Sequence, residues 1–274
     1  MTDSSGVVVA ARGRVVPPLF VFRRSLRMVE RNVLAYRRSW FVFLTGFAEP
    51  FLYLASIGIG VGGLVGDVAL PTGDLVPYEL FVAPGLLAAA AMNGSVLDTT
   101  FNFFVKYKYA HTYDGVLATP LGVGDVAIGE VTWALLRGGL YALAFLVTML
   151  ALGLVESAWA VLAVPAAVLI GYGFAGAGLA ATTWMRSFVD FDYVNLAIIP
   201  MFLFSATFFP AGRYPGAVEW VVRVTPLYQG VALERALVLG DAGPGLLVHV
   251  AYLAVMGTVG LRIARARLGR LLQP

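Results

Sequence analysis

Long uncharged apolar stretches constrain the fold of this chain more than any other feature. Three of them contain no Asp, Glu, Lys or Arg, namely residues 157–185, 193–212 and 242–261. A helix that crosses about 30 Å of hydrocarbon needs about 20 residues, so each stretch is long enough to span a membrane. Charged residues form only 13% of the chain, about half the share that is usual in a soluble domain. Lipid must therefore replace water over much of the surface.

Hydropathy predicts an all-α integral membrane protein with six transmembrane helices. The first and third spans contain internal charges, whereas the last three are almost free of them. The predicted spans cover about residues 40–62, 78–98, 124–152, 157–182, 191–210 and 243–262. The six-helix domain would occupy residues 40–265, between a flexible tail at 1–16 and a second tail at 266–274.

The basic residues predict the orientation of these spans. With the amino terminus in the cytoplasm, the outer segments hold only Arg213, Arg223 and Arg235. The inner segments then hold Arg12, Arg14, Arg23, Arg24, Arg27, Arg31, Arg37, Arg38, Lys106, Lys108, Arg186, Arg262, Arg265, Arg267 and Arg270. Cytoplasmic loops carry an excess of Lys and Arg, so both termini are expected in the cytoplasm. The Arg-, Ala- and Gly-rich composition suggests a bacterial source, and hence the plasma (inner) membrane.

Residues 17–39 are predicted to form an amphipathic helix ahead of the first span. Pro17 and Pro18 suit a helix start. The apolar positions repeat at helical spacing, at Phe22, Leu26, Val29, Val33, Tyr36 and Trp40. Such a helix lies in the membrane interface, with the apolar face in lipid and the arginines toward headgroups or a partner. The alternative is that the arginines only set the topology.

Two connections between the predicted spans are expected to be more than plain loops, one because of its composition and the other because of its length. The inner connection at 99–121 mixes aromatic and basic residues, which suits either docking onto another surface or an ordinary interfacial loop. The outer connection at 211–242 is too long to lack structure in a compact domain. Pro215 and Pro226 divide it, so it is expected to form short helices that re-enter the outer leaflet.

Three charged residues lie inside predicted spans and away from the span ends. An unpaired charge at the bilayer centre costs at least about 2.5–3.5 kcal/mol, so each should face protein, water or a partner. Glu49 precedes Pro50, which can kink the first helix. Glu130 and Arg137 are seven residues apart and share a helix face, which predicts either a pair or a shared polar network. These charges serve either the transport path or the ties between helices.

Several chemistries are excluded by what the sequence lacks. There is no Cys, so neither a disulfide nor a thiol nucleophile is possible. Lys106 and Lys108 lie in no glycine-rich phosphate loop, and no HExxH or GxSxG motif occurs. The arginines cluster near the chain ends in a pattern that does not suggest nucleic-acid binding. The chain is therefore not expected to be an enzyme or to hold a metal, and any ATP hydrolysis must occur on another chain.

Several motifs, in order along the chain, resemble the type-2 permeases of ABC transporters, with the NodJ-like and daunorubicin-exporter-like exporters as the nearest subgroup. The match extends over about residues 20–265. The motifs are AEPFLYL (48–54), ELFVAPGLLAAAAMN (79–93), DGVLATPLGVGDVAIGE (114–130), PMFLFSATFFP (200–210) and TPLYQ (225–229).

The resemblance implies a permease subunit that forms a homo- or heterodimer and binds a separate ATPase, which would hold ATP and Mg. A coupling helix within residues 106–119 would dock on that ATPase. The implied contacts are Lys106, Lys108, His111, Tyr113 and Asp114. Spans two and five would flank a translocation path lined by Met92, Asn93, Phe202, Phe204, Ser205 and Phe208. The stretch 210–225 would form a re-entrant cap. Relatives of this kind export lipooligosaccharides, amphipathic drugs or envelope lipids.

Other functions make different predictions. An ion- or proton-coupled secondary transporter would use Glu49, Glu130, Arg137 and Asp192 as coupling sites, and would transport under an ion gradient alone. A membrane enzyme acting on lipids would need a nucleophile or metal site. A scaffold would transport nothing. Co-purification of an ATPase with nucleotide-dependent transport distinguishes the permease from all three.

Overall fold

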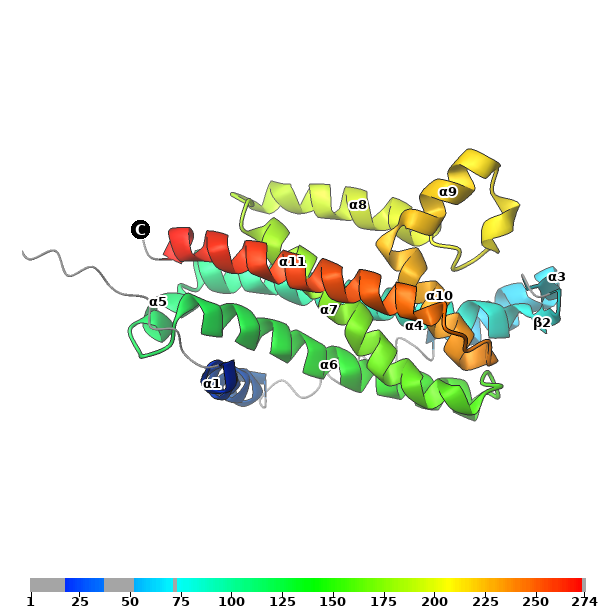
Figure 1. Cartoon of the computed structure of the whole chain (residues 1–274), viewed down its shortest axis with the longest axis horizontal. Helices are drawn as coiled ribbons and strands as arrows, with labels where there is room; N and C mark the ends of the chain where they lie inside the picture. The colour runs from blue at the N-terminus through cyan, green and yellow to red at the C-terminus, as the bar shows by residue number, and fades with distance from the viewer. Residues whose placement is uncertain (1–17, 37–51, 71–72, 273–274) are drawn as a thin grey trace, which may run out of the picture.

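A computed structural model describes residues 18–36, 52–70 and 73–272 of the chain, most of them helical (Figure 1). Four helices are long and apolar enough to cross a membrane, at Tyr78–Tyr109, Val123–Ala151, Ala158–Thr182 and Leu246–Leu272. They correspond to the second, third, fourth and sixth predicted spans. The chain is thus a mainly helical membrane protein, as the hydropathy predicts.

These four helices run along the long axis of one bundle. The first consists of α4 (Tyr78–Leu97) and its helical continuation to Tyr109. The second is α6 (Val123–Ala151), and the third begins with one 3₁₀ segment before α7 (Ala163–Thr182). The fourth, α11 (Leu246–Leu272), continues through most of the predicted tail at 266–274 because its sequence contains no helix-breaking proline there.

The remaining two predicted spans are not confirmed as full helical crossings. The first, with Glu49, lies mostly outside the described residues, and its described part belongs to a short apolar helix at Leu52–Val65. The fifth is α8 (Phe191–Leu203), which has 13 residues and is about 20 Å long at 1.5 Å per residue. Pro200 lies near its end, and Ala206 follows in the left-handed conformation, so the helix ends before residue 210.

Short helices fill the connection at 211–242, as its prolines predict. α9 (Gly216–Val224) is followed by α10 (Pro226–Leu239), which returns into the bundle and packs against α4, α7 and α11. Thr225 accepts the Tyr228 amide N–H at the start of α10, where proline is favourable. Gly240 ends α10 with a φ of 92°, a conformation that glycine adopts without steric cost.

A small β-hairpin departs from the all-α expectation. β1 (Asp67–Ala69) pairs antiparallel with β2 (Leu75–Pro77), directly before α4. The hairpin and the adjacent α3 (Gly63–Val65) lie at the end of the bundle opposite α5 (Thr112–Leu117) (Figure 1). Three-residue strands are too short to give a periodic sequence pattern, so hydropathy does not detect them.

A helix, α1 (Pro18–Tyr36), occupies most of the range 17–39, where the sequence predicts an interfacial helix. Its predicted apolar stripe is divided, because Val29 is buried while Leu26 and Val33 remain exposed. α1 lies against α6, where Met28 meets Gly129 and a β-carbon on that glycine would collide with it. One face of α1 is thus fixed to the bundle, and apolar as well as charged side chains remain exposed on the rest of the helix.

Glycines set the closest helix contact in the bundle, between α7 and α11. A β-carbon on Gly176 would collide with the backbone of Gly257, and one on Gly260 would collide with the backbone of Gly176. Small residues allow helices in membranes to approach closely. The density of small residues at 171–181 is therefore explained by packing.

Replacing Gly176 with Ala should destabilise the protein, because the added methyl group forces α7 and α11 apart. Overpacking costs about 1–3 kcal/mol, so we expect the unfolding temperature in detergent to fall by several degrees. Gly138 on α6 has nothing within 4 Å of an added β-carbon, so Gly138→Ala is the matched control. Equal stability of the two variants would refute the close α7–α11 contact.

Candidate functional site

The inner connection predicted at 99–121 is mostly helix. α4 continues through π-helical turns at Asp98–Asn102 and Val105–Tyr109, and α5 follows after one break. Thr99 and Thr100 donate to the carbonyl oxygens of Ser95 and Val96 at 2.7 and 2.6 Å, which satisfies their hydroxyls within the helix. We refer to residues 98–109 as the α4 extension.

Glu130 of α6 forms a buried ion pair with Lys106 of the α4 extension. The Lys106 Nζ lies 2.7 Å from the Glu130 Oε2, and the two side chains are 17% and 4% exposed. Asn32 of α1 also donates to this oxygen at 3.3 Å, and the Arg31 guanidinium lies 3.9 Å from the other. One carboxylate therefore connects α1, the α4 extension and α6.

Arg137 makes a second buried pair, about two helical turns further along α6. Its guanidinium donates to Asp98 at 2.5 Å, and Asn102 donates to the same carboxylate oxygen at 2.6 Å. Glu130 and Arg137 therefore do not pair with each other, although they share a face of α6. Each takes a partner from the α4 extension, which corrects the expected direct pair and leaves the shared polar network. We call these pairs, with Asn32 and Asn102, the inner network.

The inner network can hold these helices in one arrangement because its charges are balanced. Lys106 and Arg137 offset Glu130 and Asp98 within a buried region. Removing one partner of a buried pair costs about 3–5 kcal/mol, because the other charge is left without compensation. The helix ties are therefore strong only while both members of each pair are present.

α5 presents charged side chains outward and an aromatic one inward. Tyr113 is 1% exposed and stacks on Phe103 at 5.0 Å between ring centroids. Burial raises the pKa of the Tyr113 hydroxyl well above its usual value. His111 and Asp114 are about 70% exposed and lie 3.2 Å apart. The chain turns into α5 at His111, whose φ is 46°.

The predicted docking residues thus divide into two groups. Lys108, His111 and Asp114 are exposed at the end of the bundle, where a partner could contact them. Lys106 and Tyr113 are held inside, because one pairs with Glu130 and the other stacks on the α4 extension. They support the α5 surface without forming part of it.

An aromatic cluster, which sequence reasoning missed, joins the α4 extension to the start of α8. Its rings are Phe101, Phe104, Tyr109, Phe188 and Phe191, with centroids 4.9–6.1 Å apart. Nearby, the backbone N–H groups of Arg186 and Ser187 donate to Asp190 and lower the pKa of its carboxyl. The density of aromatic residues in FNFFVKYKY is the signal that could have revealed this cluster.

The residues predicted to line a translocation path differ in their burial. Met92 and Ser205 are fully buried, whereas Asn93 and Phe204 are exposed. Phe202 and Phe208 are half-buried and meet edge-on, 5.2 Å apart. Along α8 no described residue is buried, so this helix presents a largely free apolar surface.

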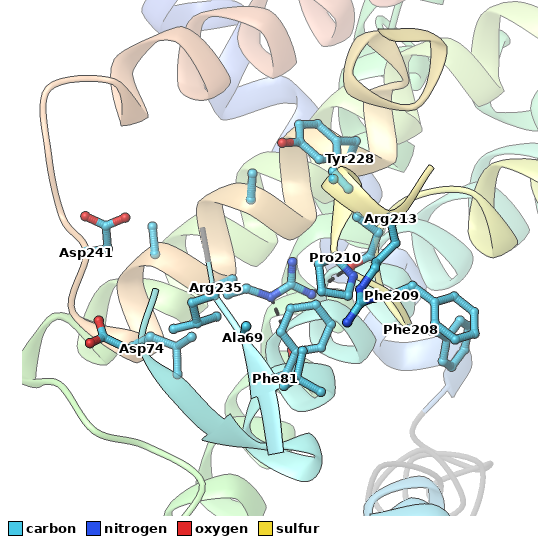
Figure 2. Close-up of a pocket in the computed structure, with 18 of the residues that line it drawn as sticks. Ala69, Asp74, Phe81, Phe208, Phe209, Pro210, Arg213, Tyr228, Arg235 and Asp241 are labelled. Atoms are coloured by element: carbon cyan, nitrogen blue, oxygen red, sulfur yellow. Dashed lines mark hydrogen bonds between the residues drawn. The ribbon is translucent and has the colours of Figure 1, made fainter. Parts of the chain in front are cut away.

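A cavity of about 1290 Å³ lies at the end of the bundle opposite α5 (Figure 2). Its walls come from the β-hairpin, the start of α4, residues 206–213, α10 and the start of α11. Among the residues predicted for the path, only Phe208 lines it. Its charged lining is described below.

The family model described as ABC-2 type transporter matches residues 25–239, most of the chain. The chain belongs to the ABC-2 type transporter family. Residues 98–137, with the inner network and α5, lie inside the matched region. This transporter is therefore a multi-pass membrane protein whose family functions in transport.

Curated relatives agree over nearly the whole length. This ABC-2 type transporter is 30% identical to nodulation protein J of Rhizobium meliloti (strain 1021), over 89% of its own chain and 92% of that protein. It is also 30% identical to nodulation protein J of Rhizobium leguminosarum bv. trifolii, over 88% and 90% of the two chains.

The inner network predicts an unusual stability pattern. Arg137→Leu leaves Asp98 buried and unpaired, so we expect a loss of about 3 kcal/mol and a clear fall in unfolding temperature. Asp98→Leu combined with Arg137→Leu removes both charges and should recover most of that loss. Thermal unfolding in detergent measures both. A double variant that is less stable than either single variant would contradict the pairing.

Proposed function

We propose that this chain is the transmembrane permease subunit of an ABC exporter. It moves an amphipathic, lipid-like or drug-like substrate across the bacterial plasma membrane, and a separate ATPase subunit holds ATP and Mg and hydrolyses the nucleotide. The family membership supports the transport role. The observation that carries the mechanism is α5, which presents exposed charges and is anchored by Tyr113 on the α4 extension.

α5 suits the role of a coupling helix because force applied to it reaches the transmembrane helices directly. Tyr113 anchors α5 on Phe103 of the α4 extension. The extension is continuous with α4 and is tied to α6 through Lys106 and Arg137. Movement of an ATPase that grips Lys108, His111 and Asp114 would therefore displace α4 and α6 together.

The orientation and assembly follow from the same arrangement. Basic residues of the α4 extension and of the end of α11 lie at the α5 end, together with the last described residue, so we place this end and both termini in the cytoplasm. α9 and α10 then form the re-entrant segment on the outer side. The free apolar surface of α8, together with the exposed Leu97 and the exposed amide of Asn93 on α4, suits contact with a second permease protomer or with substrate.

The ion-coupled alternative finds less support in the geometry. Glu130 and Arg137 are each paired with a neighbouring helix, so neither is free to bind a transported ion. Glu49 lies outside the described residues. Glu234 of α10 favours this alternative, because it is fully buried and, within the described chain, neither of its carboxylate oxygens has a hydrogen-bond partner. Transport by the purified chain under a proton gradient alone would establish it.

Charge reversal on α5 tests the coupling role. Asp114→Lys should reduce ATP-driven transport in proteoliposomes at least about tenfold, because a partner contact worth about 1.4 kcal/mol or more changes binding by that factor. The unfolding temperature should hardly change, because Asp114 is exposed. The assay uses the chain reconstituted with its partner ATPase subunit.

Glu156→Lys is the matched control, since it makes the same charge change at an exposed site on the connection between α6 and α7. It should transport normally. If Asp114→Lys transports as well as this control, or if no ATPase subunit binds the chain, then α5 is not the coupling surface.

A further inference from the structure

The cavity opposite α5 contains a half-buried positive charge that no carboxylate of the described residues neutralises. Arg235 of α10 donates from Nε to the carbonyl oxygen of Phe81 at 3.2 Å and from Nη2 to that of Ala206 at 2.8 Å. Its guanidinium also lies 3.9 Å over the Phe81 ring. Among the described residues, no acidic oxygen lies within 4.0 Å of it.

A second guanidinium reaches the same cavity. Arg213 follows the turn after Phe209, and Figure 2 shows its side chain directed toward the part of the cavity that holds Arg235 and Phe81. Arg213 is exposed and forms no ion pair within the described part of the chain. The third arginine that lines the cavity, Arg223, is already paired with Glu219 at 2.6 Å.

The charges of the lining are separated. Asp74 and Asp241 lie on the far side of the cavity from Arg235 and Arg213 in Figure 2. Apolar side chains, including Phe81, Phe208 and Leu246, form much of the remaining cavity wall. A ligand that fits this lining needs an anionic group for the arginines and apolar bulk for the aromatic wall.

The hydrogen-bond donors of a guanidinium determine which anionic groups fit this cavity. A guanidinium presents several N–H donors in one plane, which matches the two or three oxygens of a carboxylate or phosphate. Arg235 uses two donors on carbonyl oxygens and retains others for a ligand. Because the site is partly removed from water, its attraction for an anion is less screened than at an open surface.

We propose that this cavity binds the phosphate or carboxylate headgroup of an anionic amphiphile, with Arg235 and Arg213 as the contacts. The inference deepens the proposed function, on which it rests where it names the substrate class. The alternative is that Arg235 only ties α10 to α4 and to the turn at Ala206. Binding of a matched pair of amphiphiles separates these two roles.

The test measures binding to the purified full-length chain in phosphatidylcholine nanodiscs, without ATPase, by isothermal titration calorimetry. The probes are dioctanoyl phosphatidic acid, dioctanoylglycerol, which has the same chains without the phosphate, and inorganic phosphate. We expect saturable binding of the phosphatidic acid only. Arg213→Gln and Arg235→Gln should each weaken it at least about tenfold, as loss of a charged hydrogen bond implies.

Two further variants keep the test decisive. Arg270→Gln removes the same charge from an exposed site at the end of α11 and should leave binding unchanged. Arg235→Lys retains a positive charge and should bind more tightly than Arg235→Gln. If Arg235→Gln does not fold, the exposed Arg213 carries the test.

Several results would overturn the proposal. They are equal binding of phosphatidic acid and dioctanoylglycerol, unchanged binding in Arg213→Gln, and binding of inorganic phosphate as tight as that of the lipid, which would reduce the cavity to a free-oxyanion site. Failure of ATP-driven transport with these binding results intact would refute the proposed function and leave the binding site standing.

Discussion

The buried pairing of two charged residues of α6 with the α4 extension is the interaction on which the rest of the arrangement depends. A charge inside a membrane bundle is tolerated only with a partner. Glu130 and Arg137 meet this requirement by holding Lys106 and Asp98. This fixes the helical extension against α6, Asn32 fixes α1 to the same point, and α5 is anchored on the extension. The buried charges inside the bundle therefore fix the position of the α5 surface at its end.

The positions of the long helices could be predicted well from sequence, because they depend on local composition. The third span was predicted at 124–152 and is found at Val123–Ala151. The fifth was overestimated because hydropathy detects an unbroken apolar run at 193–212 but not the end of α8 at Leu203. For the inner connection the sequence left open a docking segment or an ordinary interfacial loop. Its lysines and polar residues lower hydropathy, so hydropathy did not show that the backbone continues from α4 as π-helical turns.

The partners within the site could not be predicted, because they are set by contacts between helices. Spacing showed that Glu130 and Arg137 share a face of α6, but not that the helical α4 extension supplies the opposite charges. Asp98 was missed, although a lone acid at the end of a predicted span is the kind of residue that needs a partner. The cavity at the other end is formed by the β-hairpin and by α10, which returns into the bundle. No local sequence pattern therefore predicts this cavity.

In the proposed mechanism, α5 and α6 move as one unit when the ATPase acts. Because the chain has no Cys, spin labels can be attached at Gly115→Cys on α5 and Gly138→Cys on α6, where an added side chain meets nothing within 4 Å. Pulsed electron resonance then measures their separation in the complex with the ATPase. We predict one narrow distance that ATP does not change, and a broad distribution when Arg137→Leu is added. A distance that shifts with ATP in the otherwise unaltered chain would show that α5 moves independently of the helices, and would contradict the account.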